Sequence, residues 1–385
     1  GESLTERVDT YLGIAGLSID NPVGDFTGIF LQVERFNAKL NLVALMTGRL
    51  VFSEAHLYQP VIQLEIDTAG NQNWKFPQNH LDEESGIRSL LFIQQLKDKL
   101  GNRSNASTEI EFQDSWAVMV GEEGRGVRTI IDMVQGNRFY CSFSSAALMR
   151  QGLVQALHHT THRTAFHKKL IEQSLMRNVL ADLAVEAEAA LVLTLRIARA
   201  IDESASDESA AALARIGTAV GKYWICKRAP GHTFESMECH GGPGYIEESI
   251  MPRLYREAPV NSIWEGSGNV MCLDVLRAMF REQAAIPAVL DEVDAARGGN
   301  ANLDRAVNRL KEELNDPADM ELRARGVTEL MAVTLTASLM VRCAPTAVAD
   351  AFCASRLGSL WTGCYGALPA AVDFDAIISR ANPAQ

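Results

Sequence analysis

The sequence lacks the patterns that mark several common classes of protein. Its seven cysteines include no CxxC pair, so neither a disulfide framework nor a zinc site is expected. No stretch approaches the roughly 18 uninterrupted apolar residues of a membrane span, so we expect none. Acidic residues outnumber basic ones by 48 to 36, and the formal net charge of -12 opposes broad attraction to nucleic acid or anionic membranes. Neither a Gly-x-Ser-x-Gly nor an HExxH motif points to hydrolase chemistry.

The first 95 residues differ in pattern from the rest of the chain. In all, 385 residues, 47% of them apolar, suffice for two or three domains. Apolar and polar residues alternate over 36–42 and 62–67, which predicts strands with one buried face. The glycine-rich stretch GEEGRG (121–126) predicts a turn, and the pattern is helical from there on. The expected fold class is therefore α+β, a β-rich N-terminal segment followed by a mainly α-helical body.

Two apolar stripes at three- and four-residue spacing predict long helices on either side of a polar loop. That loop, DESASDES (202–209), offers Ser or Asp to cap the second helix. The first stripe comprises Leu175, Val179, Leu183, Ala187, Leu191, Leu195 and Ala198. The second comprises Leu213, Ile216, Val220 and Trp224. Long helices joined by short loops predict an antiparallel four-helix bundle.

The densest chemical signal lies around one carboxylate. Glu265 precedes a Gly-Ser-Gly turn that opens an apolar helical run, and the neighbouring Trp264 can shield it from water. A shielded carboxylate on such a turn is suited to act as a general base. On the local residues alone, the alternative is a first-turn Glu that stabilises the following helix.

Two stretches carry a resemblance to a known family. GHTFESMECHGGPGYIEESIMPRLYRE (231–257) and PVNSIWEGSGNVMCLDVLR (259–277) resemble the C-terminal signature of the acyl-CoA dehydrogenase superfamily, closest to its AidB-type branch. The resemblance runs from about residue 96 to 385. It implies three parts: a remnant of the middle β-domain (96–134), the C-terminal helical bundle (135–282) and an AidB-like helical extension (283–385). It also implies a flavoprotein that binds FAD and removes hydrogen from an acyl-CoA substrate.

The same resemblance assigns roles to single residues. Glu265 matches the family's catalytic base, and Trp264 stands in the substrate pocket where the wider family usually has Tyr. The residues that match cofactor-binding positions are Arg163, Phe166, Gly241, Gly242, Ser267 and Asn269. In the family the Arg-x-x-Phe-Gly element reaches the flavin of a neighbouring subunit, although His167 here replaces its Gly. Taken alone, the arginine is a solvated charge, and the two glycines fit either a helix C-cap and turn or a backbone that a cofactor approaches.

The N-terminal segment resembles a different family. YLGIAGLSIDNPVGDF (11–26), residues 33–67 and GNQNW (70–74) are similar to the start of AsmA-family envelope proteins, and carry no catalytic residue. The segment (1–95) stands where a complete dehydrogenase has its first domain and most of its β-domain. We therefore expect a join near 76–96, a true start upstream of Gly1, weak FAD retention and low activity. The dehydrogenase-like part implies a cytoplasmic location, whereas the AsmA-like part alone implies the inner membrane or periplasm.

Two other functions remain open. The AidB-type extension is associated with duplex DNA and the response to DNA alkylation, and Arg305, Arg309 and Lys311 could form a basic stripe, unless they are a solvated helix face. A non-enzymatic envelope module is the third reading.

The resemblance also implies a homo-oligomer formed through the helical bundle. His158 and His162 are four residues apart on a predicted helix, but nothing completes a metal site, so no metal is expected.

Overall fold

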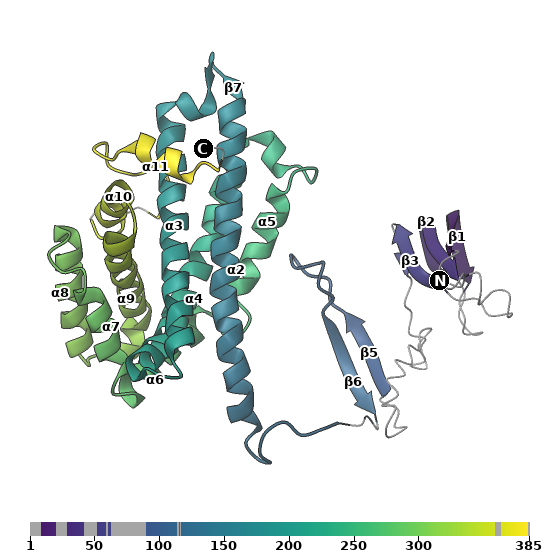
Figure 1. Ribbon diagram of the computed structural model, residues 1–385, viewed down its shortest axis with the longest axis horizontal. Coiled ribbons are helices and arrows are strands. Elements are labelled where there is room, and N and C mark those ends of the chain that lie inside the picture. Colours follow the sequence, from purple (N-terminus) through teal and green to yellow (C-terminus); the bar gives the residue numbers. More distant parts are fainter. Residues whose placement is uncertain are drawn as a thin grey trace, which may run out of the picture. The chain divides into compact units, whose positions relative to one another are not determined.

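The computed structural model describes residues 9–20, 29–41, 52–58, 61–62, 90–113, 115, 117–358 and 363–383. The chain divides into two compact units. The first comprises Gly1–Lys97 and Ala106–Val118, and the second comprises Asp98–Asn105 and Met119–Gln385. The candidate site lies in the second unit, which Figure 1 draws as a group of packed helices.

The first unit contains two separate antiparallel sheets. Strands β1 (Asp9–Asp20), β2 (Ile29–Asn41) and β3 (Phe52–Tyr58) are neighbours in that order, and β4 (Val61–Ile62) also pairs with β2. Strands β5 (Leu90–Leu96) and β6 (Thr108–Gln113) form a hairpin. The predicted strand over 36–42 coincides with β2 as far as Asn41, whereas most of the one over 62–67 lies outside the described residues. The AsmA-like character of this segment stays a prediction.

Three long helices form the centre of the second unit. They are α2 (Gly126–His162), α3 (Ser174–Glu203) and α4 (Glu208–Glu238), and each packs against the other two. The hairpin β7 (Thr164–Ala165) and β8 (Lys168–Lys169) and the short helix η1 (Leu170–Glu172) connect α2 to α3. The predicted turn precedes α2, with Gly121 and Gly124 at positive φ. Asp207 caps α4 as expected, because its carboxylate accepts hydrogen bonds from the backbone N–H groups of Ser209 and Ala210.

Shorter elements follow α4 along the chain. They are η2 (Gly242–Tyr245), α5 (Met251–Glu257), η3 (Ala258–Ser262), α6 (Gly268–Arg281), α7 (Ala285–Asp294), α8 (Ala301–Asn315), α9 (Met320–Cys343), α10 (Thr346–Arg356) and α11 (Phe374–Ala381). Helix α6 packs on α4, and α9 packs on α3, α4 and α6. One buried cluster includes residues from both sides of the predicted boundary at 282/283. The predicted bundle and the predicted extension therefore share a core.

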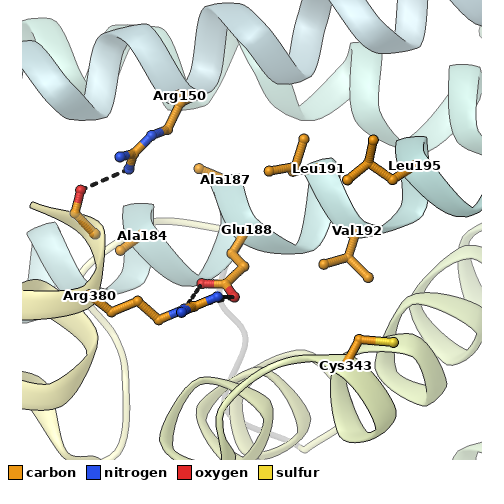
Figure 2. A pocket seen from close by; sticks show the side chains of 10 residues that line it. Arg150, Ala184, Ala187, Glu188, Leu191, Val192, Leu195, Cys343 and Arg380 are labelled. Carbon is orange, nitrogen blue, oxygen red and sulfur yellow. Dashed lines mark hydrogen bonds and ion pairs between the residues drawn. The ribbon is translucent and has the colours of Figure 1, made fainter. Parts of the chain in front are cut away.

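The apolar stripe predicted for α4 is confirmed, and the one predicted for α3 is wrong in part. Leu213, Ile216, Val220 and Trp224 are all buried. On α3, however, Leu175, Leu191 and Leu195 are exposed. The reason is that α2, α4 and α9 cover α3 from several sides, so its buried residues do not follow one stripe. Leu191 and Leu195 instead line an open groove of about 410 Å³ (Figure 2).

Helix α9 has the length and composition to cross a membrane, as judged over the described residues. In its most apolar window, however, 67% of the residues are buried inside the protein. Its apolar character is thus explained by contacts with α3, α4 and α6.

Candidate active site

Glu265 lies on a tight turn between η3 and α6. Its own φ is +57° and that of Gly266 is +113°, so two successive residues adopt left-handed backbone conformations. For a residue with a side chain this conformation is uncommon and costs free energy unless the surroundings hold it. The φ of +113° at position 266 is a backbone conformation that residues with a side chain rarely adopt, so this position favours glycine. The turn therefore needs both its glycine and external support.

Two cationic side chains supply that support from different helices. Arg138 of α2 donates from Nε to the carbonyl oxygen of Glu265 over 2.9 Å. Lys222 of α4 donates from Nζ to the carbonyl oxygen of Gly266 over 2.7 Å. Asn137 donates from Nδ2 to the carboxylate of Glu265 itself over 3.2 Å. The half-buried carboxylate is thus directed toward α2 and does not extend freely into solvent.

Below the turn, Asp274 of α6 is held by two guanidinium groups. Arg138 Nη1 donates to it over 3.0 Å, and Arg215 donates through both terminal nitrogens over 3.0 and 2.9 Å. Burial lowers the pKa of Lys222. Burial also raises the pKa of the nearby Cys141 thiol, which keeps it protonated at neutral pH. The Cys141 thiol is therefore poorly suited to accept a proton at this site.

A cavity of about 680 Å³ adjoins the turn. Trp264, which is 41% exposed, lines it together with apolar residues of α2, α5 and η3, among them Phe143, Leu148, Leu254 and Val260. Glu265 is not among the lining residues. Trp264 therefore lies at the wall of a largely apolar cavity, and the Glu265 carboxylate lies beside that cavity; the role of Trp264 in a substrate pocket stays a prediction.

The predicted cofactor residues fall into two groups. Ser267 and Asn269 adjoin Glu265, because they form the N-cap and the first turn of α6. Both are exposed. The hydroxyl of Ser267 makes no capping hydrogen bond, and Oδ1 of Asn269 accepts from Arg325 Nε over 2.8 Å.

The second group lies at the far end of α2. Arg163 directly follows α2, and Phe166, 89% exposed, sits at the tip of the β7–β8 hairpin. Phe166 and His167 both have positive φ, 52° and 65°. The Gly that His167 replaces in the family pattern would adopt this conformation without steric cost.

The paired glycines belong to this second group and not to the Glu265 group. The ring of His240, next to Gly241, packs 4.8 Å from that of His159, near the C-terminal end of α2. Asn137, which contacts Glu265, lies near the other end, about 33 Å away at a rise of 1.5 Å per residue. Within one chain, the paired glycines and Glu265 therefore lie near opposite ends of α2. Figure 1 shows β7 and α6 near opposite ends of α2.

Two further clusters were considered from the sequence, the basic stripe on α8 and the histidine pair on α2. Lys311 is paired with Asp294 over 2.7 Å, so Arg305 and Arg309 remain as the exposed charges of the predicted basic stripe. The ring centroids of His158 and His162 lie 4.5 Å apart, and the rings are tilted by 39°. No group of side chains within the described part of the chain is arranged to hold a metal ion. All seven cysteines are free.

Sequence reasoning missed the residues that support the turn. Arg138, Lys222 and Asp274 look like ordinary helix charges when only the sequence is considered. One signal was available for Lys222, because it is the single charged residue in the run AVGKYWIC (219–226). A charge in such a run is buried with the helix, and a buried charge requires a polar partner.

Comparison with known proteins places this geometry in a family context. Residues 124–280 match the family model described as "Acyl-CoA dehydrogenase, C-terminal domain". This part of the chain, from the start of α2 to the end of α6, therefore has the fold of that domain. The fold and the region of the predicted resemblance are confirmed to this extent.

Individual relatives agree with this assignment. AidB of Escherichia coli (strain K12) is 42% identical over 301 residues, which are 78% of this chain and 54% of that protein. The crystal structure of Caenorhabditis elegans ACDH-11 in complex with C11-CoA has a TM-score of 0.66 at 25% identity, and the match covers 78% of this chain and 57% of that one. A Bacillus anthracis acyl-CoA dehydrogenase complexed with FAD shares the fold, with a TM-score of 0.59 at 15% identity over 69% and 55% of the two chains. The chain thus spans little more than half the length of these relatives.

Proposed function

We propose that this chain is an acyl-CoA dehydrogenase-like flavoprotein of the AidB type, in which Glu265 removes the α-proton of an acyl-CoA thioester. The observation that carries the proposal is the held turn. A carboxylate on a constrained backbone lies beside a cavity of about 680 Å³ with a largely apolar wall. A general base must lie within hydrogen-bond reach of the proton that it takes. The relative solved with C11-CoA supports a thioester as the substrate class.

The residues around the turn would divide the work. The apolar side chains of Phe143, Leu254 and Trp264 would hold the acyl chain and exclude water from it. Asn137 would orient the carboxylate of Glu265 through its amide. Proton transfer then requires only that the α-carbon be held against that carboxylate, because fixed geometry replaces the search for a productive orientation.

The exposed residues at both ends of α2 suit FAD. A Cβ atom at Gly241 or Gly242 would meet nothing within 4 Å, so another molecule can approach that backbone closely. Arg163 is exposed, and its planar fork suits a diphosphate. The exposed Ser267 and Asn269 offer polar contacts beside Glu265. FAD, when bound, supplies the acceptor for the hydride that leaves the β-carbon.

The separation of the two groups favours a homo-oligomer. One chain presents Ser267 and Asn269 near the Asn137 end of α2 and Gly241 near His159, and Asn137 and His159 are about 33 Å apart along the helix. The family resemblance assigns the arginine element to a neighbouring subunit's flavin. We therefore propose that each chain contributes its two groups to two different flavins.

FAD affinity and turnover should be low in this chain. None of residues 126–137 of α2 is buried, and apolar side chains such as Ile130 and Met133 are exposed one to two turns before Asn137. An uncovered site admits water and weakens polar contacts within it. The DNA-binding alternative receives less support, because the pairing of Lys311 with Asp294 reduces the charge of the predicted stripe.

The test loads the purified chain with FAD and mixes it anaerobically with saturated acyl-CoA thioesters of increasing chain length. Bleaching of the flavin band is expected for the wild type and not for Glu265→Gln, which keeps the shape but cannot accept the proton. Glu248→Gln, at an exposed carboxylate on the preceding segment, is the matched control and should bleach like the wild type. Equal bleaching by Glu265→Gln would remove this residue from the mechanism. Stoichiometric FAD retained through purification would contradict the expected weak affinity.

A further inference from the structure

Side chains from other helices hold the turn that carries Glu265 by binding its backbone carbonyl groups. Glu265 and Gly266 have positive φ, and hydrogen bonds to their two successive carbonyl oxygens come from separate helices. A left-handed conformation at a residue with a side chain persists only where the surroundings determine it. Here both donors, Arg138 and Lys222, are cationic side chains.

Both donors are withdrawn from solvent. Lys222 is 1% exposed and Arg138 is 8% exposed. Burying a cation is unfavourable unless polar groups compensate it. Lys222 meets such a group in the carbonyl oxygen of Gly266, which lies 2.7 Å from its Nζ. A core position on α4 that only needed packing would be filled at lower cost by an apolar residue.

Arg138 joins the turn to the helix that follows it. Its Nε binds the carbonyl of Glu265, and its Nη1 binds the carboxylate of Asp274 on the second turn of α6. Arg215 holds the other side of Asp274 and also pairs with Glu282 at the end of α6 over 3.1 Å. The guanidinium of Arg138 is therefore fixed from both sides, and it in turn fixes the start of α6 relative to Glu265.

We infer that Arg138 and Lys222 are positioning residues for the candidate base, with Asp274 orienting Arg138. They hold the turn by its two carbonyls, so that the Glu265 carboxylate stays beside Asn137 and the Trp264 cavity. Neither side chain would touch substrate. This inference rests on the proposed function for its catalytic consequence, but the holding of the turn is independent of it.

The test compares Lys222→Met, Lys222→Gln and Lys227→Met in the full-length chain. Lys227 is exposed on the same helix, and its side chain passes close to Gly268, so it controls for loss of charge near the turn. Hydrogen–deuterium exchange of the amides over 264–269 is measured first, without FAD. Loss of one charge-assisted hydrogen bond should raise local exchange about tenfold or more in Lys222→Met. The centre of α3 should be unaffected.

The conservative variant and the kinetics separate positioning from a purely structural role. Lys222→Gln keeps an N–H donor and should restore part of the protection, and it also replaces the methionine variant if that one fails to fold. With FAD loaded, the methionine variant should bleach more slowly at saturating acyl-CoA, while the half-saturating concentration stays unchanged. Exchange equal to that of Lys227→Met would overturn the inference. So would faster exchange with an unchanged bleaching rate.

Failure of the proposed function has a different signature. In that case the wild type itself does not bleach with any thioester. The exchange measurement then still decides whether Lys222 holds the turn, because it needs neither FAD nor substrate.

Discussion

The protein contains two buried clusters in which arginines pair with carboxylates, and the two clusters differ in what they contact. In the first, Arg138 and Arg215 hold Asp274 beside the Glu265 turn. In the second, Arg356 holds both Asp182 and Glu186, at 2.6 Å each. Both clusters compensate carboxylates that lie inside the protein, but only the first contains an arginine that binds the backbone of the Glu265 turn.

The second cluster is closed within the core. Asp182 and Glu186 have no exposed side-chain surface, and the exposure of the Arg356 side chain is 3%. Asp182 also accepts from the backbone N–H of Gly366 over 2.9 Å, and Arg228 of α4 pairs with Glu186. This cluster joins α3, α4, α10 and the segment before α11. The comparison indicates that the closed cluster stabilises the fold, while the open one orients a site.

The largest predicted effect comes from opening the closed cluster. Arg356→Met removes the guanidinium and leaves two carboxylates buried with less compensation, which should lower the free energy of unfolding by about 3 to 5 kcal/mol. The measurement is urea unfolding followed by helical circular dichroism. The matched control is Arg380→Met, because Arg380 pairs with Glu188 at a site where its own side chain is 49% exposed. That change should cost less than about 1 kcal/mol.

Equal losses for the two variants would contradict the distinction between buried and exposed pairs in this protein. A loss in Arg356→Met without any change in the exchange of amides 264–269 would sharpen the comparison. It would show that the two clusters act on separate parts of the second unit.

The second prediction concerns acid, and it uses His232, which lies against the closed cluster. Burial lowers the pKa of His232 from 6.5 to about 4. Its Nε2 donates to the carbonyl oxygen of Leu183 over 3.0 Å, and its ring meets that of Tyr365 edge-on. Between pH 6.5 and 4 the unfolded chain binds a proton that the folded chain does not, so stability falls as the pH is lowered. The loss from this residue should reach about 3 kcal/mol.

Unfolding at a series of pH values in the wild type and in His232→Gln checks this. Glutamine keeps a donor for Leu183 but cannot take up the proton, so the variant should lack this part of the acid loss. Glu186 affects stability at lower pH than His232. Burial opposes its ionisation, but Arg356 and Arg228 lower its pKa to about 2. Its contribution to stability is therefore lost as the pH falls from about 4.5 to 2. Burial raises the pKa of Asp182, which works in the opposite direction. Identical pH curves for the two proteins would contradict the assignment to His232.

Much of the helical fold could be predicted because it depends on local patterns. The stripe on α4 and the Asp207 cap are properties of neighbouring residues. The stripe on α3 failed at Leu191 and Leu195, because the periodicity of one helix does not show how many helices surround it. The position of the bundle's partner α9 depends on contacts between segments far apart in the chain, which no local pattern specifies.

The candidate site was predictable only in part for the same reason. The turn at Glu265 and the adjacent Ser267 and Asn269 are contiguous, so their proximity follows from the sequence. The distance from Glu265 to Gly241 does not, because it depends on the course of α5 and η3 along α2. Arg138 comes from 127 positions earlier in the chain, and nothing in its local sequence indicates the carbonyl that it binds.

The smallest expected effect tests the uncovered part of α2, next to the open cluster. Val127 and Ile130 are 78% and 53% exposed. Changing each to Ser should alter the free energy of unfolding by no more than about 0.5 kcal/mol. The two side chains bury little apolar surface that the change could remove, and Val, Ile and Ser have similar helix propensities. Leu153, on the same helix but 1% exposed, is the contrast. Leu153→Ala should cost about 2 to 5 kcal/mol.

A small effect at Val127 and Ile130 would mean that this surface is open to water in solution, which agrees with a weakly held cofactor. A loss above about 1 kcal/mol would instead mean that something covers the surface. Sedimentation of the same variants then identifies the cover. If the loss disappears on dilution together with an oligomer, a second copy of the chain covers this part of α2. If the loss does not depend on concentration, the cover comes from the same chain. In either case the cluster around Asp274 would be enclosed, as the cluster around Arg356 is. The expected affinity for FAD would then have to be revised upward.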